Sequence, residues 1–354
     1  MIDLFYPYIP DEAADEVAKV LRSRWVGQGP KVDEFEREFD RLFGTSNSVA
    51  LNSGTSALET AYDLIGIGPG DEVISTPLTC TATNLPLLAR GAKIVWADIR
   101  EDTLTSDPKD ILAKVTPRTK AVVHVHLGGV ESCLGKMPVP VVSDACQAMG
   151  VFNGDFTCCS FQAIKHITTG DGGMLTVNNP EQARTARLMR WFGIDREKKI
   201  KNNWQAYTER KMTFDIEILG YKRQMTDIDA ALGIVGLRHY HEVLDHRTNL
   251  YKKYLEGLAG IDGIKIVGVG HRSIHWLMTV LVKRRDEFAK MMFEAGVDTN
   301  IVQVRNDLYK IFGGRREELP CLNRVEGEYI SLPIGMNVTE EDVGYICDAI
   351  KSGW

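Results

Sequence analysis

The chain has 354 residues, of which 44% are hydrophobic, 25% charged and 8% aromatic, a composition typical of folded globular proteins. At roughly 150 residues per domain, this length indicates two domains or one large one. The 42 basic and 48 acidic residues leave a net charge of −6, which excludes the broad basic face that a nucleic-acid-binding protein usually carries.

The first third of the chain alternates helical and strand-like patterns. Amphipathic helices are predicted over residues 11–24 and 31–43, and Gly44 ends the second. Compact runs rich in β-branched residues then alternate with helical patterns, which predicts parallel βαβ units. The strands are expected at 48–51, 72–75, 93–97, 121–125 and 139–143, and the helices between them include 57–65 and 108–115.

The rest of the chain is predicted to hold a loop at 165–175, a helix with a solvated arginine face at 180–191, and one long helix at 226–256. The polar segment 195–211 between them is expected to be exposed or mobile. A smaller α+β unit is then predicted, with strands at 263–267, 275–282 and 331–333 and helices at 286–295 and 340–350.

These patterns predict an α/β fold with a large domain over residues 1–235 and a small C-terminal domain over residues 236–354. The longest uncharged stretch, residues 73–89, contains several Thr and two Pro, so no membrane span is expected. The cysteine count of seven is odd and includes no CxxC pair, which favours a reducing cytoplasm over a secreted disulfide framework.

The strongest local signal is the segment 160–173, Ser-Phe-Gln-Ala-Ile-Lys-His-Ile-Thr-Thr-Gly-Asp-Gly-Gly. Its Lys165 lies between a short apolar run and a Gly-rich loop, where burial could lower the ammonium pKa and make the amine a nucleophile towards aldehydes. The alternative is a solvated loop lysine, but three other segments supply what a reactive lysine would need.

Asp144 follows the strand predicted at 139–143, and α/β folds bind ligands at the carboxyl ends of their strands. Its carboxylate could pair with the pyridinium nitrogen of a pyridoxal ring, and Gln147 could hydrogen-bond the ring's phenolic oxygen. The alternative for Asp144 is a helix N-cap.

The segment Asn-Ser-Gly-Thr-Ser at 52–56 lies between a predicted strand and a predicted helix. Backbone N–H groups at a helix start, flanked by hydroxyls, form a cradle for a phosphate, although Ser and Thr are also common helix caps. Ser160, five residues before Lys165, could reach the same phosphate.

These motifs resemble the DegT/StrS family of sugar aminotransferases, which use pyridoxal phosphate (PLP) and have the type I aspartate aminotransferase fold. The resemblance implies a large domain with a mostly parallel sheet flanked by helices, and a smaller C-terminal α+β domain. It is carried by residues 25–32, 51–58, 68–74, 144–150, 160–173, 220–227 and 332–334.

The resemblance implies that Lys165 forms the Schiff base with the cofactor and moves the proton during catalysis, while Asp144 pairs with the pyridinium and Gln147 lies near the ring's oxygen. In the family, a Gly-Tyr-Asn-type segment reaches the phosphate of the neighbouring subunit. Here residues 220–224 read Gly-Tyr-Lys-Arg-Gln, so Lys222 or Gln224 would take that role in a homodimer with shared active sites. The implied phosphate ligands are Gly54, Thr55, Ser56 and Ser160.

Two departures from the family pattern concern the cofactor ring and the substrate. Cys80 occupies the position of the aromatic residue that usually stacks on the ring, and Val-Arg-Asn-Asp at 304–307 replaces the usual Pro-Leu-His sugar contact. His124 and His126 alternate on one strand, but no third ligand has a convincing spacing, so no metal is expected. The predicted substrate contacts are Trp25, His126, Arg305 and Asn306.

The expected activity is transamination of a nucleotide-linked 4-keto-6-deoxy sugar at C4, with a donor such as L-glutamate. PLP would become pyridoxamine phosphate (PMP) during turnover, and the product would enter an O-antigen or surface glycan. The alternatives are a PMP- or PLP-dependent nucleotide-sugar 3-dehydratase of the same family, in which His replaces the lysine, and a non-catalytic sugar-nucleotide-binding regulator. Lys165 argues against the first, although His166 is adjacent, and the intact set of site residues argues against the second.

Overall fold

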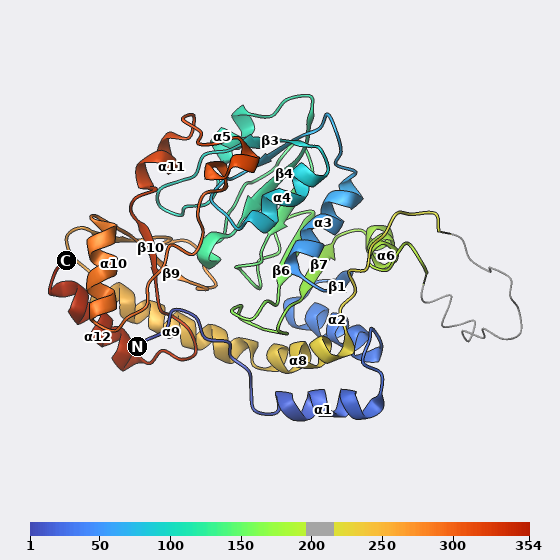
Figure 1. Cartoon of the computed structure of the whole chain (residues 1–354), viewed down its shortest axis with the longest axis horizontal. Helices are drawn as coiled ribbons and strands as arrows, with labels where there is room; N and C mark the ends of the chain where they lie inside the picture. The colour runs from blue at the N-terminus through green and yellow to red at the C-terminus, as the bar shows by residue number, and fades with distance from the viewer. Residues whose placement is uncertain (196–215) are drawn as a thin grey trace, which may run out of the picture.

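The computed structural model describes residues 1–195 and 216–354, so that the segment predicted to be exposed at 195–211 lies, apart from Asp195, outside the described residues. Within this part of the chain, a seven-stranded sheet and a three-stranded sheet form the framework (Figure 1). No helix among the described residues is long and apolar enough to cross a membrane.

The large sheet has the strand order β1-β7-β6-β5-β4-β2-β3. Only β7 runs against its neighbours, so the mostly parallel α/β architecture expected from the sequence is confirmed. The central strands are buried on both faces, which is why they read as continuous apolar runs. The strands are β1 (Ser48–Leu51), β2 (Glu72–Ser75), β3 (Lys93–Trp96), β4 (Thr119–Val125), β5 (Val141–Asp144), β6 (Phe156–Ser160) and β7 (Gly173–Val177).

Helices cover both faces of this sheet. On one face lie α3 (Gly54–Ile65), α4 (Thr81–Ala89) and α6 (Pro180–Met189). On the other face lie α2 (Pro30–Phe43), α5 (Pro108–Ala113) and α8 (Asp227–Arg238), with α1 (Ala13–Ser23) packed outside α8 (Figure 1). Helix α4, which contains Pro86, and the strands β6 and β7 were not predicted, and the loop predicted at 165–175 runs into β7.

The long helix predicted at 226–256 is two helices, since α8 ends at Arg238 and α9 (Tyr240–Gly257) begins after His239, the cap residue between them. Helix α9 leads to the antiparallel small sheet, whose order is β10-β9-β8. Its elements are β8 (Ile264–Ile266), β9 (Met278–Val282), α10 (Arg285–Glu294), α11 (Pro320–Val325), β10 (Tyr329–Leu332) and α12 (Glu340–Lys351).

The N-terminal segment crosses to this small sheet. Ile2 pairs with Val297, and the two chain ends lie near α12 (Figure 1). The predicted domain limit between residues 235 and 236 falls inside α8, and the division into two domains stays a prediction.

The arginine face predicted for the helix at 180–191 is only partly solvated. Arg187 and Arg190 both pair with the buried carboxylate of Glu36, at 2.8 and 2.6 Å. Burial raises the pKa of Glu36, but the two guanidinium groups outweigh it and hold the pKa below its ordinary value. The prediction was therefore wrong for these two arginines, because the spacing of charges on a helix does not reveal a partner 150 residues away in the chain.

A buried histidine on β4 makes the fold sensitive to acid. His124 is 1% exposed, and neither ring nitrogen has a hydrogen-bond partner among the described residues. Burial lowers the pKa of His124 from 6.5 to about 4. As the pH falls below 6.5, His124 becomes protonated in the unfolded chain but stays neutral in the folded chain. Acid therefore stabilises the unfolded state, and the free energy of unfolding decreases.

We expect this group alone to remove about 2 kcal/mol of stability between pH 7.5 and pH 5. In His124→Leu, the loss of stability over that range should be smaller by this amount, because a side chain that cannot take up a proton replaces the titrating ring. Urea unfolding of both proteins at the two pH values measures the difference. An unchanged pH dependence in the variant would contradict the assignment.

Candidate active site

A cavity of about 530 Å³ lies at the carboxyl edge of the large sheet, where the ends of β1, β2, β5 and β6 meet. α/β folds place their ligands at this edge, and the volume suits a cofactor-sized molecule. The lining brings together segments from the whole chain, namely Phe5, Ser53, Gly54, Thr55, Leu58, Cys80, Ala82, Asp144, Cys146, Gln147, Ser160, Gln162, Ile164, Lys165, Asp171, Trp276, Asn300, Val302 and Gln303.

Lys165 lies in this cavity against Trp276. Its Nζ is 3.6 Å from the centre of the indole ring, whose Nε1 donates a hydrogen bond to the carbonyl of Ile164 at 2.9 Å. Arg247 donates a hydrogen bond to the backbone carbonyl of Trp276 at 2.9 Å. Burial lowers the pKa of Lys165, while nearby Cys146, Asp144 and Cys80 act in the opposite direction. The amine is therefore less protonated than an exposed lysine, as a nucleophile requires.

Asp144 ends β5 and is 3% exposed. One carboxylate oxygen accepts from the N–H of Cys146 at 3.1 Å, and the other accepts from the Thr83 hydroxyl at 2.7 Å. No helix begins after Asp144, so the alternative of a helix N-cap is wrong. Gln147 is also buried, and its Oε1 accepts from the N–H of Gly128 at 2.8 Å. That bond leaves the amide NH₂ of Gln147 as a donor at the cavity.

The start of α3 forms the predicted anion cradle. Ser53 caps this helix by accepting from the N–H of Ser56 at 3.0 Å, so the helix begins at Gly54 and not at residue 57. A side chain at Gly54 would place its Cβ 2.9 Å from that of Ser160, so only glycine lets the two segments approach this closely. The N–H groups of Gly54 and Thr55 belong to the first turn, which has no intrahelical acceptors, and these two residues line the cavity together with Ser160.

Two of the other predicted cofactor contacts have different surroundings. Ser56 does not line the cavity, because its hydroxyl donates to the side chain of Asn52 at 2.7 Å and accepts from that of Ser53. This arrangement caps the helix and does not support a phosphate contact. Cys80, in contrast, lies at the start of α4 and lines the cavity.

The structure does not place His126, a predicted substrate contact, in the cavity lining. The ring is fully buried, Nδ1 accepts from the N–H of Ser132 at 2.8 Å, and Nε2 therefore donates to the Ser143 hydroxyl at 2.7 Å. Because both ring nitrogens are hydrogen-bonded inside the protein, neither is free to bind a sugar hydroxyl.

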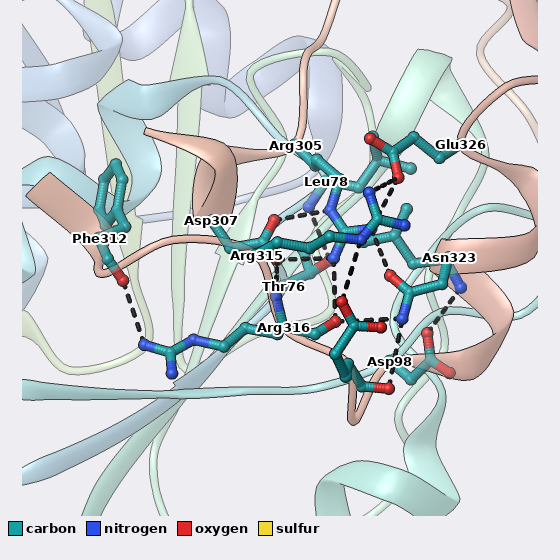
Figure 2. Close-up of polar contacts among 12 residues, drawn as sticks. Thr76, Leu78, Asp98, Arg305, Asp307, Phe312, Arg315, Arg316, Asn323 and Glu326 are labelled. Atoms are coloured by element: carbon teal, nitrogen blue, oxygen red, sulfur yellow. Dashed lines mark hydrogen bonds and ion pairs between the residues drawn. The ribbon is translucent and has the colours of Figure 1, made fainter. Parts of the chain in front are cut away.

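Arg305 and Asn306 are also fully buried and do not line the cavity. Figure 2 shows Arg305 surrounded by polar groups, and its guanidinium pairs with Asp307 at 2.6 Å and with Glu326 at 3.1 Å. Asn306 donates to the carbonyl of Thr79 at 2.7 Å. The structure does not bring either side chain to the cavity: Arg305 holds the C-terminal segment together, and Asn306 joins it to the segment after β2.

Several lining residues were not identified from the sequence. Asp171 lies within the segment 160–173 that contains Lys165, so its place in the cavity could have been predicted from that motif. Phe5 stacks on Trp276 with ring centres 5.8 Å apart, yet 271 positions separate the two in the chain and neither belongs to a motif. Asn300, Val302 and Gln303 follow α10 and face the same space.

Trp25, Lys222 and Gln224 line a second hollow, of about 750 Å³, which shares no lining residue with the lysine cavity. Arg24 and Lys222 are the cationic side chains of its lining, and Trp191 and Phe192 add aromatic surface. Within one chain, therefore, these predicted ligands do not meet Lys165.

Comparison with known proteins agrees with this geometry. Spore coat polysaccharide biosynthesis protein SpsC of Bacillus subtilis is 33% identical over 375 residues, covering 98% of this chain and 95% of that protein. The dTDP-4-dehydro-2,3,6-trideoxy-D-glucose 4-aminotransferase of Saccharopolyspora spinosa is 31% identical over 85% of this chain and 83% of its own length.

Solved structures agree over the full length. The sugar aminotransferase CalS13 of Micromonospora echinospora superposes with a TM-score of 0.92 at 31% identity, covering 100% of both chains. Spr1654 of Streptococcus pneumoniae, solved in a PLP form and a PMP form, gives a TM-score of 0.88 at 28% identity, with the PLP form covering 99% of this chain and 97% of its own. Residues 7–351 match the sequence model of one family, and the chain belongs to that family, the DegT/DnrJ/EryC1/StrS aminotransferases.

Proposed function

We propose that the protein is a PLP-dependent aminotransferase that aminates a nucleotide-linked 4-keto-6-deoxy sugar at C4, with an amino acid such as L-glutamate as donor. The observation that carries the proposal is the meeting of Lys165, Asp144, Gln147 and the α3 cradle in one cavity. The named substrate of the Saccharopolyspora relative supports a 4-keto sugar, and the name of SpsC supports a product used in a surface glycan. Seven unpaired cysteines support a cytoplasmic enzyme.

The donor set of the cavity fits PLP. Gly54, Thr55 and Ser160 offer N–H and hydroxyl donors to the phosphate, and Asp144 offers a carboxylate to the ring nitrogen. The free amide NH₂ of Gln147 suits the phenolic oxygen. When bound, PLP supplies an electron sink for the carbon that loses its proton.

The chain's own residues supply the remaining chemistry. Lys165 would hold the cofactor through Nζ and would hold and return the proton at the same atom. The indole face of Trp276 stabilises the ammonium form of that lysine, because a cation is attracted to the ring's π face. Asp144 would offer a negative charge to the ring nitrogen of the bound cofactor.

The dehydratase alternative needs a histidine in place of the lysine. His166 is buried, does not line the cavity, and hydrogen-bonds the carbonyl of Ile274 at 2.8 Å through Nε2. Lys165, not its neighbour, is therefore the residue that faces the cavity.

The test is a panel of UDP-, GDP- and dTDP-linked 4-keto-6-deoxy sugars, each incubated with the protein, PLP and glutamate. We expect an amino sugar and 2-oxoglutarate in equal amounts from one nucleotide series. Loss of a sugar hydroxyl without consumption of glutamate would favour the dehydratase, and binding of the sugars without any turnover would favour a regulator.

We further propose a homodimer in which the second hollow of one subunit covers the lysine cavity of the other. The cavity lining carries one cation, Lys165, and two carboxylates, Asp144 and Asp171, among the described residues. The phosphates of cofactor and nucleotide, and the carboxylates of the donor, need more positive charge than this. Arg24 and Lys222 of the neighbouring subunit would provide it.

Mixing two variants tests the shared site. Lys165→Ala should be inactive, and Lys222→Ala should be impaired at low PLP because a phosphate loses its cation. After the mixed chains are refolded together, we expect activity to rise towards about a quarter of the wild-type value, since random pairing makes half of the dimers mixed and each has one intact site.

The control mixes Lys165→Ala with Lys165→Gln, which gives no intact site in any pairing. Sedimentation of the wild-type protein complements the assay. A fully active monomer, or a mixture no more active than its parts, would exclude the shared site.

A further inference from the structure

Thr83, on α4, makes a hydrogen bond directly to the carboxylate that faces the cofactor site. Thr83 is fully buried, and its Oγ1 lies 2.7 Å from Oδ2 of Asp144. The same hydroxyl lies 2.9 Å from that of Thr79, which is 1% exposed. Within the described part of the chain, Cys146 is the other partner of this carboxylate: its N–H donates to the second oxygen at 3.1 Å, and its thiol also lies beside the group.

The direction of these bonds follows from the chemistry of the groups. An ionised carboxylate only accepts hydrogen bonds, so Thr83 must donate its single proton to Asp144. Its oxygen is then left as the acceptor for the proton of Thr79. The two hydroxyls form a directed chain that ends on the carboxylate, and each bond strengthens the next where water is excluded.

The start of α4 is held in place by a buried polar network. Asn84, the residue after Thr83, accepts from Ser75 at 2.7 Å and donates to the side chain of Asn306 at 2.8 Å. Asn306 in turn donates to the carbonyl of Thr79.

The network extends beyond Asn306 in the chain and also reaches Thr83 from α3. The neighbouring ion pair of Arg305 and Asp307 fixes the backbone that carries Asn306 (Figure 2). Tyr62 of α3 donates to the carbonyl of Thr83 at 2.8 Å. The backbone of both threonines is thus held by buried hydrogen bonds, which keeps the Thr83 hydroxyl beside Asp144 and the Thr79 hydroxyl beside that of Thr83.

We propose that Thr83 is a positioning residue for the reaction, which fixes the orientation and the negative charge of Asp144 towards the ring nitrogen of the cofactor. This inference rests on the proposed function. Without the hydroxyl, one carboxylate oxygen loses its partner in a buried site and the group can rotate about its Cα–Cβ and Cβ–Cγ bonds. The remaining bond to Cys146 then fixes only one of the two oxygens.

The test compares Thr83→Val, which keeps the shape and removes the hydroxyl, with Thr83→Ser, which keeps the hydroxyl. Thr176→Val is the matched control, since its buried hydroxyl pairs with Ser48 on the same sheet and does not contact Asp144. In Thr83→Val we expect kcat to fall about tenfold, the scale of one lost hydrogen bond to a charged group, with an unchanged KM for the sugar.

Two readouts do not depend on turnover. We expect Thr83→Val to bind PLP several-fold more weakly in a fluorescence titration of the apoprotein, and the absorbance bands of its bound cofactor to shift with pH differently from the wild type. Thr83→Ser should restore both, and Thr176→Val should change neither.

Wild-type values of kcat, PLP affinity and spectrum in Thr83→Val would overturn the inference, and so would equal losses in the Val and Ser variants. A wild-type protein that binds no PLP would instead overturn the proposed function, so the two failures are distinguishable.

Discussion

Lys165→Ala is expected to abolish amino transfer, with a fall in kcat of about a thousandfold or more, because the variant loses both the group that attaches the cofactor and the base that moves the proton. The fold should be unaffected, since the side chain contacts the indole face of Trp276 and, among the described residues, donates no hydrogen bond that holds two elements together. Turnover of the preferred sugar with glutamate measures the loss.

The same variant has a covalent readout. Borohydride reduction of the wild-type protein with PLP should leave a tag on the peptide that contains residues 161–169, and Lys165→Ala should carry none. Lys109→Ala, at an exposed position on α5, is the control for removal of a lysine and should be tagged like the wild type. Full turnover in Lys165→Ala, or a tag on another peptide, would disprove the assigned role.

Asp144→Asn is expected to reduce kcat by about a hundredfold to a thousandfold, the scale on which one preorganised electrostatic group acts. The amide matches the carboxylate in shape but has no charge to hold a proton on the ring nitrogen, so the cofactor becomes a weaker electron sink. Steady-state rates in both amino-transfer directions measure the effect.

Asp155→Asn is the matched control for this change. Asp155 accepts from the N–H of Val141 at 2.8 Å, at the opposite end of β5 from the cavity. It should cost some stability and leave the rate per folded molecule unchanged. Equal rates for Asp144→Asn and the wild type would show that the carboxylate does not act on the cofactor.

The sequence predicted the parts of the fold that local pattern determines. The parallel strands β2, β4 and β5 were found because strands buried on both faces read as continuous apolar runs. Strands β6 and β7 were missed because Cys158, Cys159 and Gly173 have little β propensity of their own. They become strands because β5 and β1 offer pairing partners on either side, and such pairing overrides local propensity.

The same contrast between local pattern and distant contacts applies to the residues of the candidate site. Lys165, Asp144 and Gln147 were found because each lies in a short motif, and the structure brings all three to one cavity. Arg305 and His126 lie outside this cavity, which the sequence could not show because a position in a motif does not report which groups surround a side chain in space. Trp276 was missed because nothing in its own segment records that Lys165 will lie on its ring.

The cavity wall is built from both ends of the chain, and this determines when the cavity can close during synthesis. Its wall includes Phe5 near one end of the chain and Gln303 near the other, and Ile2 pairs with Val297. A nascent chain on the ribosome can form the parallel sheet early, but the wall stays open until residue 303 has emerged. Contacts of such long sequence separation form late in folding. Closure of the cavity is therefore expected late in synthesis, and a chain stalled before this point would leave Lys165 open to any aldehyde in the cell.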